Sequence, residues 1–592
     1  MSRAKKFIFT KVMPVLCFFF CINGFLGAPL IAQIAVSPHD FPFGYPFPAY
    51  EVGGGSHPGL SNDYLKSEPD PQRELKRIGQ YALRLIQTDS AQKAIDYTNS
   101  YLSDFAPVLE GEMYFMRSMA EAQLGMLDSA VISMKKAIGE GELPPERFIV
   151  GPRRMFDPLY QHPAYVQEWE KQVGANKLVH GPMLGAMTDS SVKVWVRTAT
   201  ETPVRVVASP SNDFSETIQS QPVLSRSDRD FTAEVTLNGL QPNTRYHYKV
   251  LLGPDQKAAR DIQHSFGTYP AEKKSHTFSI AFGGCAGYVP HNERIWDTID
   301  SVEPLAFLTL GDNVYIDDPE SPDQARYLYY QRQSRSEFQR LTGGSPVYSI
   351  WDDHDFAMDD SWGGPKVDIP YWKPMVWEIF TQNWVNPAYE SGNQPGGWYD
   401  FMIGDIHFIM LDTRYYREDA GRFDDQRKLG ASMLGPKQLA WLKETLKQST
   451  ATFTVLVSSV PWHVDAKGEG RNKVDGWAGY LKEREQIFSW INEAELEGVL
   501  LLSSDRHRSD AWMTERDDSY NLYEFASGQF TNQHTHDVLK GSLFGYNEKP
   551  SFGLLRFNTQ LDDPSVTYQI IDIDGQLQEE ITIRRSQLQF QK

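Results

Sequence analysis

Cysteine is nearly absent from this chain of 592 residues, which contains three. Cys17 and Cys21 lie in the first 32 residues, so Cys285 is the one cysteine in the rest of the sequence. One thiol cannot form an internal disulfide, which excludes a fold stapled by disulfides. Cys285 is therefore idle, reactive or bound to a ligand, and we interpret it as a metal ligand because the motifs that follow it supply partners for a metal.

Basic residues are also in deficit, since 58 Lys and Arg stand against 77 Asp and Glu for a formal charge of −19. Residues 1–32 hold four basic and no acidic residues, so their removal takes the charge from −19 to −23. Such a chain repels nucleic acid and anionic lipid over long range, and no nucleic-acid binding is expected. An anionic substrate would need a local positive centre, which bound cations can provide.

Long apolar runs are scarce, and the run over residues 12–26 is shorter than the roughly 20 residues that span a bilayer. It follows basic residues and precedes the small residues Ala28 and Ala32, a pattern that predicts a signal peptide over residues 1–32. An uncleaved membrane anchor is the alternative. We expect an exported protein, periplasmic, at the cell surface or extracellular, with no stable membrane span.

Two segments precede the part of the chain that carries chemistry. Residues 33–70 are rich in Pro, Gly and aromatic residues, which predicts an extended linker. Residues 71–170 have helical periodicity, with small and large residues spaced as in a tetratricopeptide-like helical hairpin. A plain helical bundle is the alternative. This domain serves either as a spacer or as a binding face for a protein partner.

Residues 178–270 read as strands, because Val192, Val194 and Val196 alternate with polar residues. The stretch 237–248, which contains Tyr246, is typical of a tyrosine corner in a fibronectin/Ig-like β-sandwich. No chemistry is assigned to this domain.

Residues 275–592 alternate short apolar strands with helical stretches, which predicts an α/β domain. The expected strands cover residues 277–282, 305–310, 347–351, 407–411, 453–457 and 499–502, and a helix is expected to begin at Gly435. In such a domain ligands collect at the carboxyl ends of the strands. Reactive side chains do follow these strands, at Cys285, in residues 311–315 and 351–355, at Asp412 and Arg414, at His463, and in residues 504–507.

Four short motifs then identify a resemblance. They are Gly-Asp-x-x-Tyr at 311–315, Trp-Asp-Asp-His-Asp at 351–355, Leu-Asp-x-Arg at 411–414 and Ser-Asp-x-His at 504–507. In this order they resemble the alkaline phosphatase D (PhoD-like) family of metallophosphoesterases. The resemblance covers the C-terminal half, and a preceding β-sandwich is usual in that family. The resemblance implies a C-terminal α/β metallophosphoesterase-like sandwich after an all-β fibronectin/Ig-like sandwich. Together with the helical periodicity of residues 71–170, the expected fold is a multidomain chain whose N-terminal region is helical and tetratricopeptide-like.

The resemblance also implies a metal cluster and its ligands. Fe(III) and Ca(II) are the expected ions, with other divalent metals as alternatives; thiolate and phenolate suit a highly charged ion and carboxylates suit a hard divalent one. Asp353 and His463 are candidates either as ligands or as side chains that orient the ligands. His354 and Arg414 are the catalytic candidates, Arg414 either as a phosphate clamp or as a partner of Asp412. The implied ligands are Cys285, Asp312, Tyr315, Asp359, Asp505 and His507.

Two positions depart from the family pattern. Asp359 and Asp360 stand where the family often has an asparagine that binds the divalent ion, and Ser504 stands where glycine is usual. His534 and His536 resemble a metal pair, although loop histidines at this spacing are often incidental.

The sequence as a whole predicts an exported metal-dependent phosphoesterase that acts on phosphomonoesters, phosphodiesters or both through metal-activated water. A degenerate phosphate- or metal-binding module with a partner-recruiting helical domain is the alternative from another class. A helical scaffold without any site would bind no metal.

Overall fold

The computed structural model describes residues 67–105, 108–172, 178–259, 264–421, 430–469 and 471–591, all within one compact unit that spans residues 47–592. The predicted signal peptide, residues 1–32, lies outside the described residues, as does most of the predicted linker, residues 33–70. In the part of the chain that is described, no helix has both the length and the apolar character required to cross a membrane.

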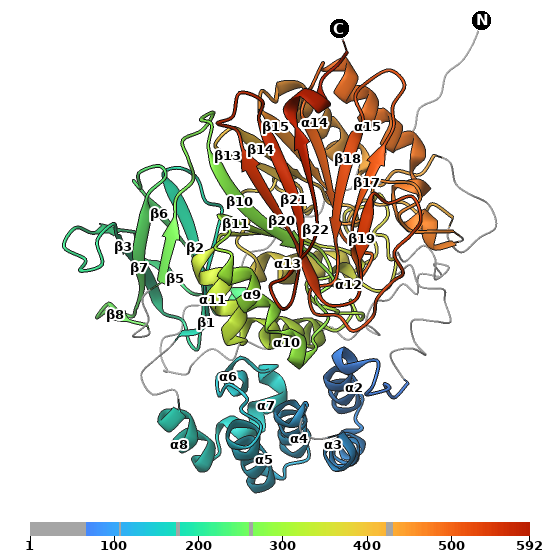
Figure 1. Ribbon diagram of the computed structural model, residues 1–592. Helices are drawn as coiled ribbons and strands as arrows, with labels where there is room; N and C mark the ends of the chain where they lie inside the picture. Colours follow the sequence, from blue (N-terminus) through green and yellow to red (C-terminus); the bar gives the residue numbers. More distant parts are fainter. Residues whose placement is uncertain are drawn as a thin grey trace, which may run out of the picture. The chain divides into compact units, whose positions relative to one another are not determined.

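The N-terminal described segment is helical (Figure 1). Its helices are α2 (Leu75–Gln87), α3 (Ala91–Phe105), α4 (Glu110–Gln123), α5 (Leu127–Gly139), α6 (Arg147–Val150), α7 (Arg153–Tyr160) and α8 (Pro163–Gln172). Helices α4 and α5 form a hairpin, in which Gly125 adopts a φ of 73° at the turn. The buried Ala120 and Ala130 let the two helices approach closely, and the Ser118 hydroxyl donates to Ala130 O at 2.7 Å.

Nine strands follow in the described residues: β1 (Leu178–Gly185), β2 (Ser191–Thr198), β3 (Pro203–Ser209), β4 (Ile218–Gln219), β5 (Val223–Leu224), β6 (Thr232–Asn238), β7 (Arg245–Leu252), β8 (Lys257–Ala258) and β9 (His264–Gly267). The predicted alternation on β2 is present, since Val192 and Val194 are buried while Lys193 is partly exposed. Tyr246 Oη accepts a hydrogen bond from Gln241 N at 2.9 Å, the contact that defines a tyrosine corner.

The remaining strands belong to two large sheets. The first has the order β22-β21-β20-β10-β11-β12-β1-β2-β6, and the second has the order β13-β14-β15-β16-β18-β17-β19. Their strands are β10 (Thr277–Gly283), β11 (Ala306–Leu310), β12 (Val347–Ile350), β13 (Tyr399–Ile403), β14 (Ile406–Met410), β15 (Phe453–Val457), β16 (Val499–Ser503), β17 (Ser509–Thr514), β18 (Leu522–Ser527), β19 (Phe544–Tyr546), β20 (Ser551–Asn558), β21 (Ser565–Asp572) and β22 (Leu577–Arg584). The first sheet runs on into the preceding β-domain, because β1 pairs in parallel with β12 at Gly185 and Val347.

The two sheets pack face to face through aromatic side chains. Phe408 of β14 and Phe453 of β15 lie 6.1 and 6.0 Å from Phe557 of β20, measured between ring centroids. Phe525 of β18 stacks on Tyr568 of β21 at 4.6 Å. Burial of these rings between the sheets supplies the main hydrophobic core of the domain.

Helices cover the outer faces of the sandwich (Figure 1). The helices are α9 (Ile295–Ser301), α10 (Pro322–Gln333), α11 (Ser336–Gly344), α12 (Asp353–Phe356), α13 (Lys373–Asn383), α14 (Gly435–Gln448) and α15 (Leu481–Glu493). Trp296 of α9 packs on Phe307 of β11, while Leu442 and Leu446 of α14 join the core of the second sheet. This arrangement confirms the predicted α/β sandwich, and α14 begins at Gly435 as expected. Both sheets mix parallel and antiparallel strands.

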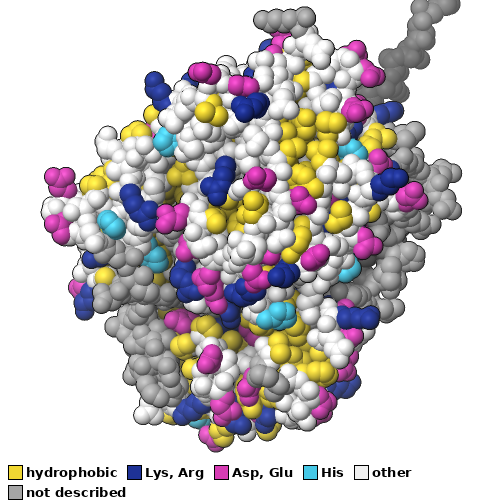
Figure 2. All heavy atoms as spheres, viewed as in Figure 1, with side chains coloured by type: hydrophobic (Ala, Val, Ile, Leu, Met, Phe, Trp, Pro, Cys, Tyr) yellow, Lys and Arg dark blue, Asp and Glu magenta, His cyan; other side chains and the backbone are white. Residues whose placement is uncertain are grey.

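Acidic and basic side chains are interspersed over the face drawn in Figure 2. On that face the acidic excess of the chain is not gathered into one patch.

Candidate metal centre

The predicted site residues lie at the carboxyl ends of parallel strands from both sheets. Cys285 follows β10, Asp312 follows β11 and α12 begins directly after β12, whereas Asp505 and His507 follow β16 in the other sheet. The backbone is left-handed at Cys285 (φ 57°), Asp312 (φ 52°), Asp505 (φ 71°) and His507 (φ 44°). Such φ values are uncommon for residues other than glycine and are concentrated at functional sites.

Glycines permit the close approach of these strand ends. A Cβ atom at Gly284 would lie 2.3 Å from Ser504 Oγ, and one at Gly311 would lie 2.5 Å from Asp352 Cβ. Either contact is far shorter than van der Waals distance. Ser504, which replaces the usual glycine of the family, thus fills the space beside Gly284, and its Oγ lies 4.0 Å from Cys285 Sγ.

Four of the predicted ligands come together in one cluster. One ligand atom each of Cys285, Asp312 and His507 lies within 4.8 Å of the others. The Tyr315 hydroxyl lies 3.0 Å from Asp312 Oδ2 and 3.2 Å from His507 Nε2. The Tyr315 hydroxyl also accepts from Asn532 Nδ2 at 2.7 Å. A thiol, a carboxyl, a phenol and an imidazole therefore converge on one point.

Protonation in this cluster depends on burial. Burial, followed by the neighbouring Asp312, raises the pKa of the Cys285 thiol and of the Tyr315 phenol well above their usual ranges. Burial and then Asp353 raise the pKa of Asp312. Burial, and then Lys76, lowers the pKa of His507, which keeps its ring neutral. Buried groups of this kind become anionic ligands when a cation compensates their charge, so the donor set fits a metal ion.

A second group of possible ligands, mostly carboxylates, adjoins the first. Asp312, Asp353 and His354 each place a ligand atom within 4.8 Å of the others, and so do Asp353, Asp359 and Asp360. Asp353 also accepts from Asp360 N at 2.5 Å. Asp312 belongs to both the sulfur-containing group and the group with Asp353 and His354.

His354 is fixed by contacts on two sides. Its Nδ1 lies 2.5 Å from Asp317 Oδ1, and its ring lies against the Tyr315 ring with centroids 4.2 Å apart. Burial opposes the charged imidazolium, but Asp317 outweighs it together with Asp353 and Asp312, and the pKa of His354 is raised well above its usual value. The ring is therefore held protonated beside the ligand cluster.

Arg414 is buried. Its guanidinium does not pair with Asp412, one of the two predicted roles, and donates to two other aspartates instead. Its Nε donates to Asp352 at 2.5 Å, and Nη1 and Nη2 donate to Asp475 at 2.8 and 3.1 Å. Of the Arg414 donors, the backbone N–H is the one that contacts the Asp412 carboxylate, at 2.9 Å. In this structure the guanidinium supports the carboxylates behind the metal ligands.

Lys467 extends the ion pairs of Arg414, because both side chains contact Asp475. Its Nζ lies 2.6 Å from Asp505 Oδ2 and 2.8 Å from Asp475 Oδ2. The predicted ligand Asp505 is therefore ion-paired, and among the described residues it belongs to none of the ligand groups that converge within 4.8 Å. The side chain nevertheless shares a network with Asp352 and Asp353 through Arg414.

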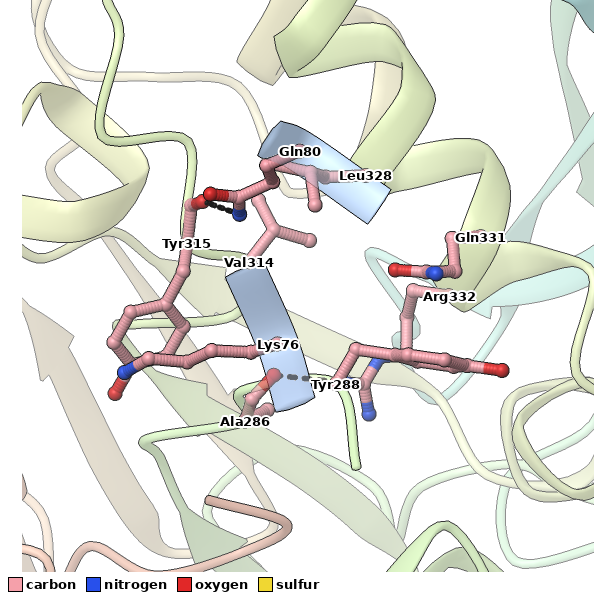
Figure 3. Close-up of a pocket in the computed structure, with 9 residues that line it drawn as sticks. All are labelled: Lys76, Gln80, Ala286, Tyr288, Val314, Tyr315, Leu328, Gln331 and Arg332. Carbon is pink, nitrogen blue, oxygen red and sulfur yellow. Dashed lines mark hydrogen bonds between the residues drawn. The ribbon is translucent and has the colours of Figure 1, made fainter. Parts of the chain in front are cut away.

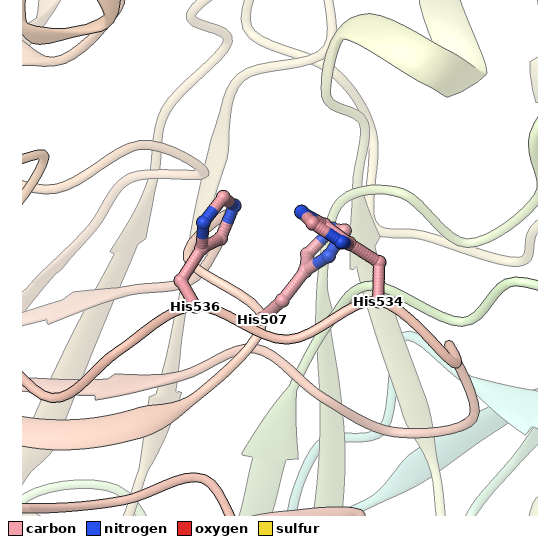
Figure 4. Close-up of side chains that lie close together, drawn as sticks. All are labelled: His507, His534 and His536. Carbon is pink, nitrogen blue, oxygen red and sulfur yellow. The ribbon is translucent and has the colours of Figure 1, made fainter. Parts of the chain in front are cut away.

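His463 lies apart from the clusters. Its ring stacks on Trp512 at 4.6 Å and its backbone N–H donates to Glu524 at 2.7 Å. His534 and His536 instead approach the centre: each places a ring nitrogen within 4.8 Å of His507 and of the other (Figure 4). His507 Nδ1 is buried and lacks a hydrogen-bond partner in the described part of the chain, so this triad offers further metal-binding nitrogens.

Sequence reasoning missed Asp317, Lys467, Asp475 and Asn532. Asp317 lies two residues beyond the Gly-Asp-x-x-Tyr motif, and Asn532 precedes the paired histidines at 534 and 536, so proximity to a motif was an available signal for both. Lys467 lies in a loop and Asp475 ends the short 3-10 helix Arg471–Asp475; both lie between β15 and α15, where nothing in the local sequence marks them.

The comparisons with known proteins come from sequence and from structure. The PhoD-like phosphatase family model matches residues 280–578, and the model of the PhoD-like phosphatase N-terminal domain matches residues 164–265. Alkaline phosphatase D of Bacillus subtilis (strain 168) is 21% identical over 377 residues, covering 56% of this chain and 64% of that protein. Purple acid phosphatase 23 of Arabidopsis thaliana is 25% identical over 249 residues, covering 39% of this chain and 48% of that protein.

Two solved structures share the fold. The structure of PhoD superposes with a TM-score of 0.58 at 18% identity, covering 69% of this chain and 90% of that chain. The purple acid phosphatase PPD1 from yellow lupin (Lupinus luteus) seeds superposes with a TM-score of 0.51 at 12% identity, covering 69% of this chain and 75% of that chain. The first family model alone spans half of the sequence, residues 280–578 of 592, and the chain therefore belongs to the PhoD-like phosphatase family.

Proposed function

We propose that this chain is an exported metal-dependent phosphoesterase that hydrolyses phosphomonoesters, phosphodiesters or both. The observation that carries the proposal is the convergence of Cys285, Asp312 and His507 within 4.8 Å, with the Tyr315 hydroxyl in hydrogen-bond contact with two of them. A thiol, a carboxyl, a phenol and an imidazole around one point suit a bound cation, and a second group of possible ligands, which shares Asp312, lies beside the first.

We further propose the ions and their ligands. Fe(III) suits the thiolate and phenolate of Cys285 and Tyr315, together with Asp312 and His507, and Ca(II) suits the carboxylate oxygens of Asp312 and Asp359. Asp505 becomes a ligand when it exchanges Lys467 for a cation, and Asp353 contributes either as a ligand or by orienting one. His463 packs against Trp512 and is the least favourably placed of the candidates.

We assign roles in hydrolysis to the cations, to His354 and to the side chains that hold the acidic loop. When bound, the cations withdraw electron density from a phosphoryl oxygen and lower the pKa of a water molecule at the site. His354, held by Asp317, keeps a proton beside the cluster and is placed to donate it to the leaving oxygen of the ester. Arg414 and Asp475 hold Asp352 in place, so the acidic loop after β12 keeps its position during turnover.

The domain organisation is part of the proposal. We assign residues 1–32 to a signal peptide, 33–70 to a linker, 71–170 to a tetratricopeptide-like helical domain, 178–270 to a fibronectin/Ig-like sandwich and 275–592 to the phosphatase domain. The match of the PhoD-like N-terminal domain model to residues 164–265 overlaps most of the assigned sandwich and begins within α8.

The test combines metal analysis, a visible spectrum and turnover of 4-nitrophenyl phosphate and bis(4-nitrophenyl) phosphate. Iron bound to thiolate or phenolate should colour the purified protein, and Cys285→Ala and Tyr315→Phe should bleach that band and lower the activity at least about a hundredfold. Tyr330→Phe is the matched control, because it removes a buried hydroxyl that contacts Asp230 instead of the cluster. A colourless protein that binds metal but turns over neither ester would refute the enzymatic proposal and favour a binding module.

A further inference from the structure

Helix α2 lies outside both segments that the family models match, yet it is seated on the metal-binding domain. Leu75 N donates to Gln533 Oε1 at 2.9 Å, Gln80 Nε2 donates to Tyr315 O at 2.6 Å and Gln87 Nε2 donates to Ser321 Oγ at 3.1 Å. These bonds fasten the helix at its start, middle and end, and the middle bond goes to the backbone of a predicted metal ligand.

Glycine makes this seat possible. A Cβ atom at Gly79 would lie 2.1 Å from Tyr327 Oη of α10, so the backbone of α2 touches the catalytic domain directly. At Gly287, just past the Cys285 turn, a Cβ atom would lie 2.9 Å from Lys76 Cδ. The Lys76 side chain therefore runs through a narrow gap between α2 and the loop that carries Cys285.

The ammonium group of Lys76 ends at the metal centre. Its Nζ lies 3.6 Å from the centroid of the Tyr315 ring. Figure 3 shows the side chain running alongside Tyr315 on one edge of a small hollow, whose other lining residues are Gln80, Ala286, Tyr288, Val314, Leu328, Gln331 and Arg332. Burial lowers the pKa of Lys76, whereas Asp317, Asp312, Cys285 and Asp359 favour its charged form, and no carboxylate in the described part of the chain is in ion-pair contact with it. Lys76 as a whole residue is partly exposed.

A cation in this position is unfavourable next to bound metal ions unless an anion lies between them. A phosphoryl group is such an anion, because its oxygens can contact the metals on one side and an ammonium group on the other. We infer that Lys76 of helix α2 is a substrate-binding residue that contacts a non-bridging phosphoryl oxygen, and that α2 forms one wall of the active site. The inference rests on the proposed phosphoesterase function.

The added charge also selects a substrate class. A phosphomonoester carries a second negative charge near neutral pH, since the second ionisation of a phosphate monoester has a pKa of about 6. A phosphodiester carries one charge, which the metal ions already compensate. Lys76 therefore favours dianionic monoesters over monoanionic diesters, and the same contact strengthens the binding of inorganic phosphate.

The experiment uses the full metal-loaded protein and compares Lys76→Gln, Lys76→Met and Lys76→Arg with wild type. Calorimetric titration with inorganic phosphate measures binding, and 4-nitrophenyl phosphate and bis(4-nitrophenyl) phosphate measure turnover. Lys93→Gln is the matched control, because Lys93 is exposed on the neighbouring helix α3. Metal content and the visible spectrum of each variant report whether the centre is intact.

The neutral variants should weaken phosphate binding about tenfold to a hundredfold, the effect of one charge-assisted hydrogen bond. They should lower kcat/KM for the monoester by a similar factor, chiefly through KM, and change the diester less than about threefold. Lys76→Arg should recover most of the loss, and Lys93→Gln should behave as wild type.

Several outcomes would overturn the inference. Unchanged phosphate affinity in both neutral variants with full metal content would show that Lys76 only packs on Tyr315. Equal losses for both esters would refute the selection of monoesters. If wild type turns over neither ester, the proposed function fails, but the phosphate titrations of wild type and Lys76→Met still decide whether Lys76 binds the anion.

Discussion

Asp475 offers the sharpest test of how the acidic site is held together. Its carboxylate is 2% exposed and receives Arg414 Nη1 at 2.8 Å, Arg417 Nη2 at 2.7 Å and Lys467 Nζ at 2.8 Å. Burial opposes the charge, but Arg414, Arg417 and Lys467 hold the pKa of Asp475 well below its usual range. Its stabilisation is therefore complete above the ordinary aspartate pKa, about 3.9, and is lost only as the pH falls below it.

Asp475→Asn keeps the shape of the side chain and removes its charge. In the variant Arg414 still pairs with Asp352 and Lys467 still pairs with Asp505. The three cations Arg414, Arg417 and Lys467 then face two carboxylates at close range instead of three. Breaking a buried ion pair by removing one partner costs about 3–5 kcal/mol, and we expect a loss of that size in the free energy of unfolding. Urea titration at pH 7.5, followed by tryptophan fluorescence, measures it.

The control is an exposed ion pair of the same chemistry. Asp297 accepts Arg340 Nε and Nη2 at 2.9 Å each, but both side chains are about half exposed. Asp297→Asn should cost no more than about 1 kcal/mol. If Asp475→Asn were destabilised only as much as Asp297→Asn, the reasoning that this network holds the acidic loop in place would be refuted.

Two further predictions concern stability and the seat of helix α2. Burial raises the pKa of Glu524 to about 7, although Ser503 and the backbone of Trp462 favour its charged form. A raised pKa means that the free energy of unfolding falls as the pH rises from about 4.3 through 7, by up to about 3–4 kcal/mol. Glu524→Gln removes this titration, so the urea midpoint of the variant should depend less on pH between about pH 5 and 8 than that of wild type. Gly79→Ala should loosen α2 and speed its amide hydrogen exchange, because the new Cβ would collide with Tyr327 Oη. Gly139→Ala meets open space and should leave exchange unchanged.

The strands of the sandwich were predictable where apolar runs are short and fully buried. β15 coincides with the predicted residues 453–457, and β16 extends the predicted 499–502 by one residue. These strands are covered on both faces, so their sequences are continuously apolar. β22 was not predicted, because it lies at the edge of its sheet and most of its side chains are exposed. The join between β1 and β12 links Gly185 with Val347, a distant pairing that local sequence patterns do not encode.

The site was predictable as far as its motifs extend. Cys285, Asp312, Tyr315 and His507 each follow a strand whose end is visible in the sequence, and the rule that ligands gather at carboxyl ends brings them together. Lys76 and Lys467 reach the same region from segments that carry no motif. Their positions depend on the docking of α2 and on the path of an irregular loop, so only the folded chain reveals them.

The basic side chains near the site differ in whether a carboxylate already pairs with them. An acidic chain that acts on an anion needs positive charge at the point of contact, and bound cations can supply it. Arg414 and Lys467 do not add to it, because Asp352, Asp475 and Asp505 already compensate them in direct ion pairs. Lys76 has no such pair in the described residues and lies 3.6 Å from the Tyr315 ring. Its charge is therefore the one among these three that remains for a ligand. The helical domain thereby gains a role in substrate affinity that a spacer would not have.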